Sequence, residues 1–533
     1  MAVVQISKIQ VRRGQKYSNT GVPQLSSGEF AWAVDSQELF IGNGSIQEGA
    51  PYVGNTKILT EHDNLIDLLG AYQFAVNTSS ITGTFSRSLQ DKLDESVSVL
   101  DFGPPEMGLK DSNIDCTPFF QNALDQLFFN ADPTFKRKLI IPAGEYKFFG
   151  DLYIPSTAYL QGENRTTVRL IFASSNIKFQ TQGLKDEQTG VVPILREGDF
   201  DSSFHPENIK VADVTIEFTT GQLNLTGLTD SIFDTTRFVS DYNSTKISQV
   251  ETANPTITWL NETSGQKTDR VTFRNTQFEF LYTVAECVQT LAFETEMTFD
   301  NCEFSTCGRG ISINGVETQS NKWLVFNCTF NEIARQAFVS PFGTSTQIIQ
   351  CRFRNCGNDT NSAADPTIYI IQFGEGNTNI VKSCSFDRLQ AAGVTSSFDK
   401  AAIPEVLGGG LVEITDRVGT NIFLSNADRP LAVFSLYNSS TTIDYTLTLG
   451  NYVRKGILTI GVEKDRSSFS ITDNYQLGAE SEVMDGFEFS GVMRNNQPTE
   501  LSDSTVDTFV LTYKNPNATG RSGNISYSVT YSV

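Results

Sequence analysis

The sequence predicts a mainly β protein. We expect a right-handed parallel β-helix, preceded by a small β-rich module and followed by an antiparallel β-sandwich. The first observation is a repeat in which an apolar-x-apolar pair is followed by Thr or Cys and, two positions later, by Phe. The Thr or Cys lies at positions 276, 302, 328, 351 and 384, which are almost evenly spaced except for a longer last step. A period mostly in the twenties is typical of a solenoid. The second observation is a change, after residue 410, to long strict alternation of apolar and polar residues. Such alternation is typical of an antiparallel sandwich.

Apolar residues two apart project from the same face of a strand, so each repeat is expected to be one coil of short strands. Equivalent residues of successive coils then stack in rows along the axis. The phenylalanines of the repeat form the expected inner aromatic row, which is Phe278, Phe304, Phe330, Phe353 and Phe386.

Six of the eight cysteines occupy two further rows of the repeat. One row holds Cys302, Cys328, Cys351 and Cys384, and the other holds Cys307 and Cys356 with Leu281, Ile333 and Leu389. Because Thr, Leu and Ile take the same positions, we expect buried free thiols and no disulfide framework.

Composition excludes several kinds of partner. The chain has 533 residues, with Lys+Arg 40 against Asp+Glu 61, so its net charge is −21. A surface this acidic repels phosphate backbones, and nucleic acid is not an expected partner. No apolar run reaches the length of a membrane helix and residues 1–15 lack the apolar stretch of a secretory signal, so membrane insertion is not expected. His62 and His205 are the only histidines, and no metal or cofactor is predicted.

The chain is expected to divide into four parts. Residues 1–73 form the β-rich module, in which Asn-Gly pairs mark turns, and 74–96 form a linker with a short neck helix. Residues 97–403 form the β-helix, and 404–533 form the sandwich. The spacing of Phe85, Leu89 and Leu93 predicts the neck helix, which would pack either against copies of itself or on its own chain.

Two features interrupt the predicted β-helix. A cap helix is expected over 117–128, with Thr117 as its N-cap and Pro118 at the first helical position. The repeat is lost between 217 and 270, which predicts a loop or hairpin insertion on the side of the coils.

Three segments give the chain a resemblance to bacteriophage tail spikes and tail fibres with a pectate-lyase-like β-helix. The opening "KIQVRRG" with "SSGEFAWAVDSQELFIGNG" resembles an N-terminal module of phage tail proteins, although Asp35-Ser36 replaces the usual Asp-Thr pair. The segment "RSLQDKLDESVSVLDFG" resembles the neck of such spikes, and "IPAGEY" with "LQGEN" resembles their first coils. These segments and the coils that follow cover about a third of the chain.

The resemblance implies a homotrimer in the virion tail, assembled in the host cytoplasm. It further implies attachment to other tail or baseplate proteins through the N-terminus, and contact with a host surface polysaccharide or receptor. Two functions remain open: a non-enzymatic virion structural protein, or a depolymerase that hydrolyses or eliminates a host glycan. A free bacterial enzyme of pectate-lyase type is a third alternative, against which the N-terminal module and the missing secretory signal argue.

Whether the chain is an enzyme depends on its carboxylates, since glycoside hydrolysis needs two of them about 5–10 Å apart. Glu294 and Glu296 lie two residues apart before a predicted strand and are the candidate catalytic pair; a solvated acidic edge is the alternative.

Arg309 and Arg335 occupy the same position on two successive coils of the repeat and are candidates for binding an anionic glycan. Their alternative is an ion pair with Glu303 or Glu332. Trp259 is a candidate for stacking on a sugar ring, or else an anchor that holds the predicted insertion to the β-helix.

Overall fold

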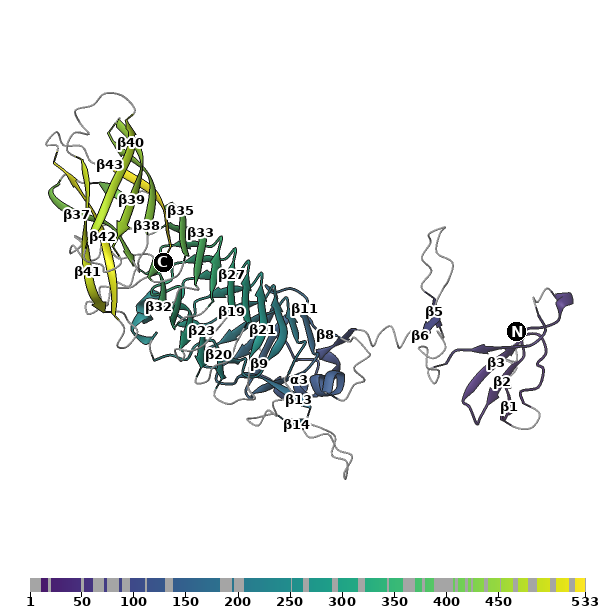
Figure 1. Cartoon of the computed structure of the whole chain (residues 1–533). Coiled ribbons are helices and arrows are strands. Elements are labelled where there is room, and N and C mark those ends of the chain that lie inside the picture. Colours follow the sequence, from purple (N-terminus) through teal and green to yellow (C-terminus); the bar gives the residue numbers. More distant parts are fainter. Residues whose placement is uncertain are drawn as a thin grey trace, which may run out of the picture. The chain divides into compact units, whose positions relative to one another are not determined.

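The computed structural model confirms a mainly β protein with a parallel β-helix and C-terminal antiparallel sheets (Figure 1). The chain divides into two compact units, Met1–Ser96 and Val97–Val533. The structure describes residues 11–17, 21–48, 52–60, 71–73, 86–88, 96–110, 113–129, 138–182, 194–195, 206–250, 252–261, 268–289, 296–314, 322–342, 345–357, 370–375, 379–387, 406–407, 411–417, 420–422, 425–435, 440–450, 452–463, 468–477, 487–498, 505–516 and 523–532.

The N-terminal unit contains a four-stranded sheet in the order β1-β2-β3-β4. Its elements are β1 (Arg12–Gly14), β2 (Phe30–Ala33), β3 (Glu38–Gly42), the 3-10 helix η1 (Ile46–Glu48) and β4 (Asn55–Ile58). Strands β1 and β2 run parallel, whereas β2, β3 and β4 are antiparallel. The carboxylate of Asp35, in the β2–β3 turn, accepts hydrogen bonds from the backbone N–H groups of Lys16 and Tyr17 at 2.8 and 2.9 Å. This side chain therefore holds the segment after β1 against the turn.

The structure describes only residues 86–88 between positions 74 and 95, and for these residues the predicted neck helix is wrong. Ser86–Ser88 are extended in β6 and pair antiparallel with β5 (Ala71–Gln73). A short helix with one narrow apolar stripe is marginal without a packing partner, whereas strand pairing satisfies the backbone groups directly. Phe85, Leu89 and Leu93 lie outside the described residues.

Strand β7 (Ser96–Ser98) begins at the last residue of the first unit, and the 3-10 helix η2 (Val99–Phe102) follows it in the second unit. The predicted cap helix is α3 (Thr117–Leu124), and one π-helical turn, η3 (Asp125–Phe129), continues it. Thr117 is not its N-cap as predicted, because the N-cap is Cys116. Thr117 is the first helical residue, and its N–H and hydroxyl both donate to the Asp115 carboxylate, at 3.0 and 2.6 Å. Phe120 and Leu124 bury the apolar face of α3 against the first coils.

Each coil of the β-helix contributes one strand to each of three faces, and strands of successive coils pair in parallel. The first face contains β8 (Lys138–Ile141), β11 (Tyr159–Gly162), β15 (Lys210–Ala212), β18 (Thr229–Asp234), β21 (Asp269–Arg274), β24 (Glu296–Asp300), β27 (Lys322–Phe326), β30 (Gln347–Ile349) and the start of β33 (Ile380–Asp387). The second face contains β9 (Gly144–Phe148), β12 (Val168–Phe172), β16 (Thr215–Phe218), β19 (Arg237–Val239), β22 (Gln277–Glu279), β25 (Glu303–Ser305), β28 (Thr329–Asn331), β31 (Arg352–Arg354) and the end of β33.

The third face closes each coil. It contains β10 (Leu152–Pro155), β13 (Ile177–Gln182), β17 (Leu223–Asn224), β20 (Ile257–Asn261), β23 (Thr283–Gln289), β26 (Arg309–Asn314), β29 (Phe338–Phe342), β32 (Ile371–Glu375) and β34 (Val406–Leu407). A two-residue strand, β14 (Ile194–Leu195), pairs antiparallel with the end of β13.

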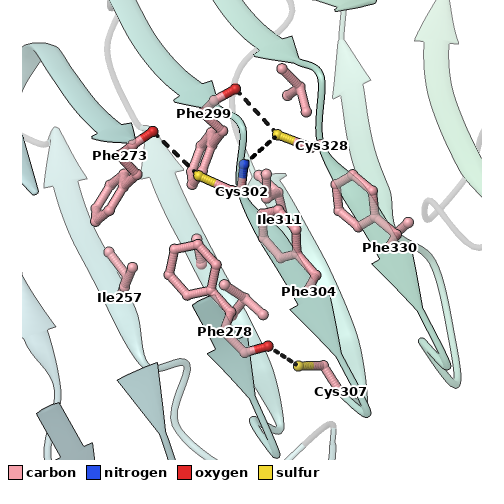
Figure 2. Packing of buried hydrophobic residues seen from close by; sticks show 14 of the residues in the cluster. Ile257, Phe273, Phe278, Phe299, Cys302, Phe304, Cys307, Ile311, Cys328 and Phe330 are labelled. Carbon is pink, nitrogen blue, oxygen red and sulfur yellow. Dashed lines mark hydrogen bonds between the residues drawn. The ribbon is translucent and has the colours of Figure 1, made fainter. Parts of the chain in front are cut away.

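The rows that the repeat predicts form the core of the β-helix. The rings of Phe278, Phe304, Phe330, Phe353 and Phe386 stack with successive centroid distances of 4.8, 4.2, 4.9 and 4.8 Å. All eight cysteines are buried and free. The six thiols of the two repeat rows donate weakly to carbonyl oxygens of the preceding coil. For example, Cys302 Sγ lies 3.3 Å from the Phe273 oxygen, and Cys328 Sγ lies 3.3 Å from the Phe299 oxygen (Figure 2).

The predicted insertion over 217–270 is wrong for most of its length. Strands β17 to β20 lie in this segment and pair in register with the coils on both sides. Phe238 stacks on Phe278 at 5.4 Å, and Phe233 stacks on Phe273 at 4.9 Å, so both rows continue through the segment. The coil between these pairs is longer than those that follow, because the chain between β19 and β20 is extended by the 3-10 helix η4 (Ser244–Gln249). Because of this longer step, the repeat could not be recognised in the sequence of this segment.

The change to the sandwich occurs later than residue 404, because β34 still pairs in parallel with β32. Strand β35 (Leu411–Arg417) pairs in parallel with β33 on one edge and antiparallel with β43 (Gly523–Ser532) on the other, so it joins the two architectures. One sandwich sheet adds β36 (Thr420–Ile422), β38 (Ser440–Leu449), β39 (Tyr452–Val462) and β40 (Phe469–Leu477). The other sheet consists of β37 (Ser425–Ser435), β42 (Thr505–Asn515) and β41 (Glu488–Pro498) in that order.

Candidate functional site

The predicted carboxylate pair is not brought together by the described residues. Glu294 lies outside them. Glu296 is exposed at the start of β24, with its Oε1 3.8 Å from Nζ of Lys322 on the next coil. Its backbone N–H donates to Oδ1 of the buried Asp269 at 2.8 Å. Glu296 therefore contacts the coils on both sides, through Lys322 on one and Asp269 on the other.

Arg309 and Arg335 lie on neighbouring coils, as predicted, and the N–H of Arg335 donates to the Gly308 carbonyl at 2.8 Å. The Nε of Arg309 donates to Oε1 of Gln336 at 3.3 Å. Glu303 and Glu332, which were the predicted ion-pair partners, accept from Gln277 at 3.0 Å and from Thr306 at 3.1 Å. Both arginines are partly buried, and they lie where the chain passes from the second face to the third.

Trp259 lies on β20, in register with Cys287 of the next coil. It does not anchor an insertion, because β20 is itself a strand of the third face. The position of its side chain is outside what the structure describes.

A hollow of about 580 Å³ lies along the corner between the first and second faces, and the sequence candidates do not include it. Its lining residues are polar, apart from one thiol: Arg165, Thr235, Asn275, Thr276, Gln277, Asn301, Cys302, Glu303, Asn327 and Thr329. We call this hollow the corner groove.

Three asparagines on successive coils form the floor of the corner groove. Asn275, Asn301 and Asn327 have φ of 52°, 53° and 52° and turn the chain from the first face to the second. Asparagine tolerates this left-handed conformation better than most residues, which explains its recurrence at the corner. The amide of Asn301 donates to Asn275 at 2.7 Å, and that of Asn327 donates to Asn301 at 3.1 Å. The regular spacing of these asparagines, each directly before the Thr or Cys of the repeat, was a signal available in the sequence.

Arg165 closes one end of the corner groove. It lies in the loop between β11 and β12, and its guanidinium donates to the Asn275 carbonyl at 3.2 Å. The Arg165 carbonyl in turn accepts from the Thr215 hydroxyl at 2.5 Å, which fixes the loop over the corner. The groove thus offers amides, hydroxyls and one cation, a combination that suits a ligand rich in hydroxyl groups.

Catalysis by paired carboxylates is not supported at this groove. Of the described residues that line it, Glu303 alone carries a carboxylate, and Gln277 donates to it. Hydrolysis of a glycosidic bond by the usual route requires a second carboxylate. The described residues also contain no cluster of three or more His, Cys, Asp or Glu side chains able to hold a metal ion.

A second hollow, of about 700 Å³, lies on the sandwich sheet formed by β43, β38, β39 and β40. Asp444, Lys455, Asn474 and Ser528 contribute to its polar lining, with Ile457 as an exposed apolar side chain among them. Within the part of the chain that the structure describes, no helix is long and apolar enough to cross a membrane.

No family model matches the chain, and no curated protein matches it either. Among solved structures the chain is similar to ORF18 of Geobacillus virus E2, with 13% identity, 88% of this chain and 90% of that chain covered, and a TM-score of 0.39. It is also similar to gp49 of the Acinetobacter baumannii bacteriophage Fri1, a tailspike and capsular polysaccharide depolymerase, with 11% identity, 98% of each chain covered and a TM-score of 0.23. A third similar structure is PfbA, a surface adhesin of Streptococcus pneumoniae, with 12% identity, 71% and 98% covered and a TM-score of 0.31. At TM-scores below 0.5 these likenesses assign neither a family nor an activity to the chain.

Proposed function

We propose that this chain is a virion structural protein, the subunit of a trimeric tail fibre or tail spike. Its N-terminal unit attaches to other tail proteins, and its β-helix contacts a polysaccharide on the host surface. The observation that carries the proposal is the exposure of large apolar side chains on the small N-terminal unit. These are Val11, Tyr17, Val34, Ile46, Tyr52, Val53 and Leu59.

These seven exposed side chains offer apolar surface for a protein partner to cover. Tyr17 is 75% exposed and Ile46 is 69% exposed, although both adjoin a well-formed sheet. The same unit has a pocket of about 200 Å³ lined by Trp32, Phe40 and Arg13, among other residues. An apolar side chain of a tail protein would fit there. The sequence resemblance of this module to those of phage tail proteins supports the same assignment.

The β-helix supports the second half of the proposal. Ladders of parallel strands with fully buried rows form a stiff body, and its outer corner carries the polar corner groove. The amides of Asn275, Asn301 and Asn327 both donate and accept hydrogen bonds, as the hydroxyl groups of a glycan chain do.

Antibody labelling tests the attachment. Phage particles whose genome encodes this chain are labelled with an antibody against it and viewed by electron microscopy, while the purified chain is sized by analytical ultracentrifugation. We expect label on the tail and a sedimenting trimer. Particles without label, or a chain that stays monomeric at micromolar concentration, would refute the proposal.

The depolymerase alternative is tested separately, by incubating the protein with extracted host surface polysaccharide and measuring the polymer length before and after. We expect polymer of unchanged length, because the corner groove presents a single carboxylate among its described lining residues. Shortened fragments would overturn the non-enzymatic assignment and direct attention to Glu294, Glu296 and surfaces between subunits.

A further inference from the structure

Outward-facing residues of the second face form a row whose charge changes along the axis. Strand pairing places Arg237, Gln277, Glu303, Thr329 and Arg352 in register on successive coils. The parallel row two residues along contains Glu279, Ser305, Asn331, Arg354 and Asp387. The second face therefore carries acidic residues near its middle, basic residues on β31, and Ser385 and Asp387 on its last coil.

The earlier arginines of this face are neutralised by carboxylates of neighbouring coils. Arg169 contacts both Glu145 and Glu217, and Arg237 contacts Glu279 at 2.5 Å. These contacts are ladder bonds between coils, and they leave little positive potential at the surface.

Arg352 and Arg354 differ from those earlier arginines. Both are exposed on β31, and no carboxylate whose side chain the structure describes lies within 4.0 Å of either guanidinium. Asp387 is the register partner of Arg354 on the next coil, and its side chain lies outside what the structure describes. Being two residues apart on one face of a strand, they project side by side about 6.6 Å apart. Lys382, also exposed, lies on the following coil just before the corner. We call these three residues the cationic patch.

The cationic patch continues the corner groove. Thr329 lines the groove and is the register partner of Arg352, one strand spacing of about 4.8 Å away. A polymer lying along the axis thus passes from the asparagine amides directly to the two guanidinium groups. On a chain with a net charge of −21, an exposed group of cations without carboxylate partners among the described side chains is a local exception.

We infer that the corner groove and the cationic patch together bind an anionic polysaccharide, with the negative groups of its sugars held by Arg352 and Arg354. This inference rests on the proposed glycan contact and specifies the charge of the glycan. A guanidinium pairs with carboxylate, sulfate or phosphate through two parallel hydrogen bonds, so each arginine offers one bidentate site. Nucleic acid fits less well, because its continuous phosphate charge is repelled by the acidic surface around the patch.

The test measures binding of the full-length chain to four immobilised polymers: a polyuronate, dextran sulfate, unmodified dextran and a DNA oligonucleotide. The R352Q/R354Q variant is compared with K455Q/K514Q, which removes the same charge from the sandwich. We expect R352Q/R354Q to weaken binding of the polyuronate or of dextran sulfate by about tenfold or more, and the control to leave it unchanged. Which of the two polymers responds identifies the anionic group. Equal thermal unfolding of both variants and wild type verifies that these exposed substitutions preserve the fold.

Extracted host polysaccharide, added as a fifth ligand, separates the two proposals. If the wild-type chain does not bind it, the proposed glycan contact fails. If wild type and R352Q/R354Q bind it equally, the glycan contact stands and the present inference fails. Binding of DNA as tight as that of the anionic polysaccharides would overturn the inference as well, because the patch would then be a general polyanion site.

Discussion

The β-helix and the C-terminal sandwich solve the problem of a buried core in opposite ways. Inside the β-helix the same neutral positions recur, so a phenylalanine meets a phenylalanine of the next coil at 4.2 to 5.4 Å. Inside the sandwich a charged side chain, Arg454, is only 4% exposed. It donates to the carboxylate of Asp473 and to the Tyr445 hydroxyl, and it stacks on the ring of Tyr475 at 3.7 Å.

The difference shows what repetition does for a core. In a row, each side chain has an equivalent above and below it, so a local change affects its neighbours in the row and leaves the register intact. The sandwich core has a centre, because Tyr445 donates to Asp473 at 2.9 Å and Arg454 binds both of them. Loss of one member leaves the others buried without their partner.

The largest expected effect is on the aromatic row. Phe330→Ala removes a ring that stacks on Phe304 at 4.2 Å and on Phe353 at 4.9 Å, and we expect it to lower the free energy of unfolding by about 4 kcal/mol. Denaturant unfolding of the full-length chain measures this loss. Phe330→Leu is the matched control and is expected to cost less, because it leaves a smaller cavity. Unchanged stability in the alanine variant would mean that the stacked phenylalanine rings do not stabilise the core of the β-helix.

Arg454→Ala tests the sandwich in the same way. The substitution leaves the Asp473 carboxylate without its cation, and we expect a loss of about 3 kcal/mol, at the low end for a broken buried pair because Asp473 keeps 18% of its side-chain surface exposed. The double variant R454M/D473N removes both charges and is expected to recover part of the loss. If the double variant is the less stable of the two, the charges themselves stabilise the sandwich.

The sequence was sufficient to predict the β-helix because a row repeats one residue type at one step, as Cys302 and Cys328 do. The segment with Phe233 and Phe238 escaped prediction because a longer connection between β19 and β20 changed the step, while the strands kept their register. The Arg454 cluster was not predictable, since alternation assigns residue 454 to the inner face and says nothing about which partners neutralise a charge there. The corner groove was predictable only in part. Its asparagines repeat, but the loop that carries Arg165 reaches them from three coils away.

The next effect depends on pH and concerns the second cysteine row. Burial raises the pKa of the Cys307 thiol to about 12, from about 9 in the unfolded chain. The folded state therefore retains this proton above pH 9 when the unfolded state has lost it, so stability falls as pH rises from 9 towards 12. Between pH 7 and 10 the contribution of Cys307 amounts to about 1.4 kcal/mol.

Cys307→Ala isolates that contribution. The variant starts less stable at pH 7 because of its cavity, but we expect it to lose about 1.4 kcal/mol less than wild type when both are unfolded at pH 10. Equal losses in the two proteins would show that the thiol ionises inside the fold without cost, which its complete burial contradicts.

The smallest expected change in stability is for a substitution that copies the residue found at the same position of a neighbouring coil. The position of Cys302 is occupied by Thr276 one coil earlier, and both side chains donate to the same two kinds of carbonyl. The Thr276 hydroxyl lies 3.1 Å from the Arg274 oxygen and 3.3 Å from the Phe233 oxygen, as Cys302 Sγ lies 3.5 Å from the Asp300 oxygen and 3.3 Å from the Phe273 oxygen.

We therefore expect Cys302→Thr to cost less than about 1 kcal/mol in denaturant unfolding, since volume and hydrogen bonding are both kept. Cys302→Val, which has nearly the shape of the threonine variant but no hydrogen-bond donor, separates these two contributions. If Val is as good as Thr, the row needs only a side chain of that size, as Val214 at the start of the β-helix indicates. If Val is worse by about 1 kcal/mol, the bond to the preceding coil helps to hold the ladder together. A loss of more than about 3 kcal/mol of unfolding free energy in the Cys302→Thr variant would be as large as the effect of a large cavity. Equivalent positions of successive coils would then not be interchangeable. The contrast between a β-helix core of repeated rows and a sandwich core around one charged residue would fail.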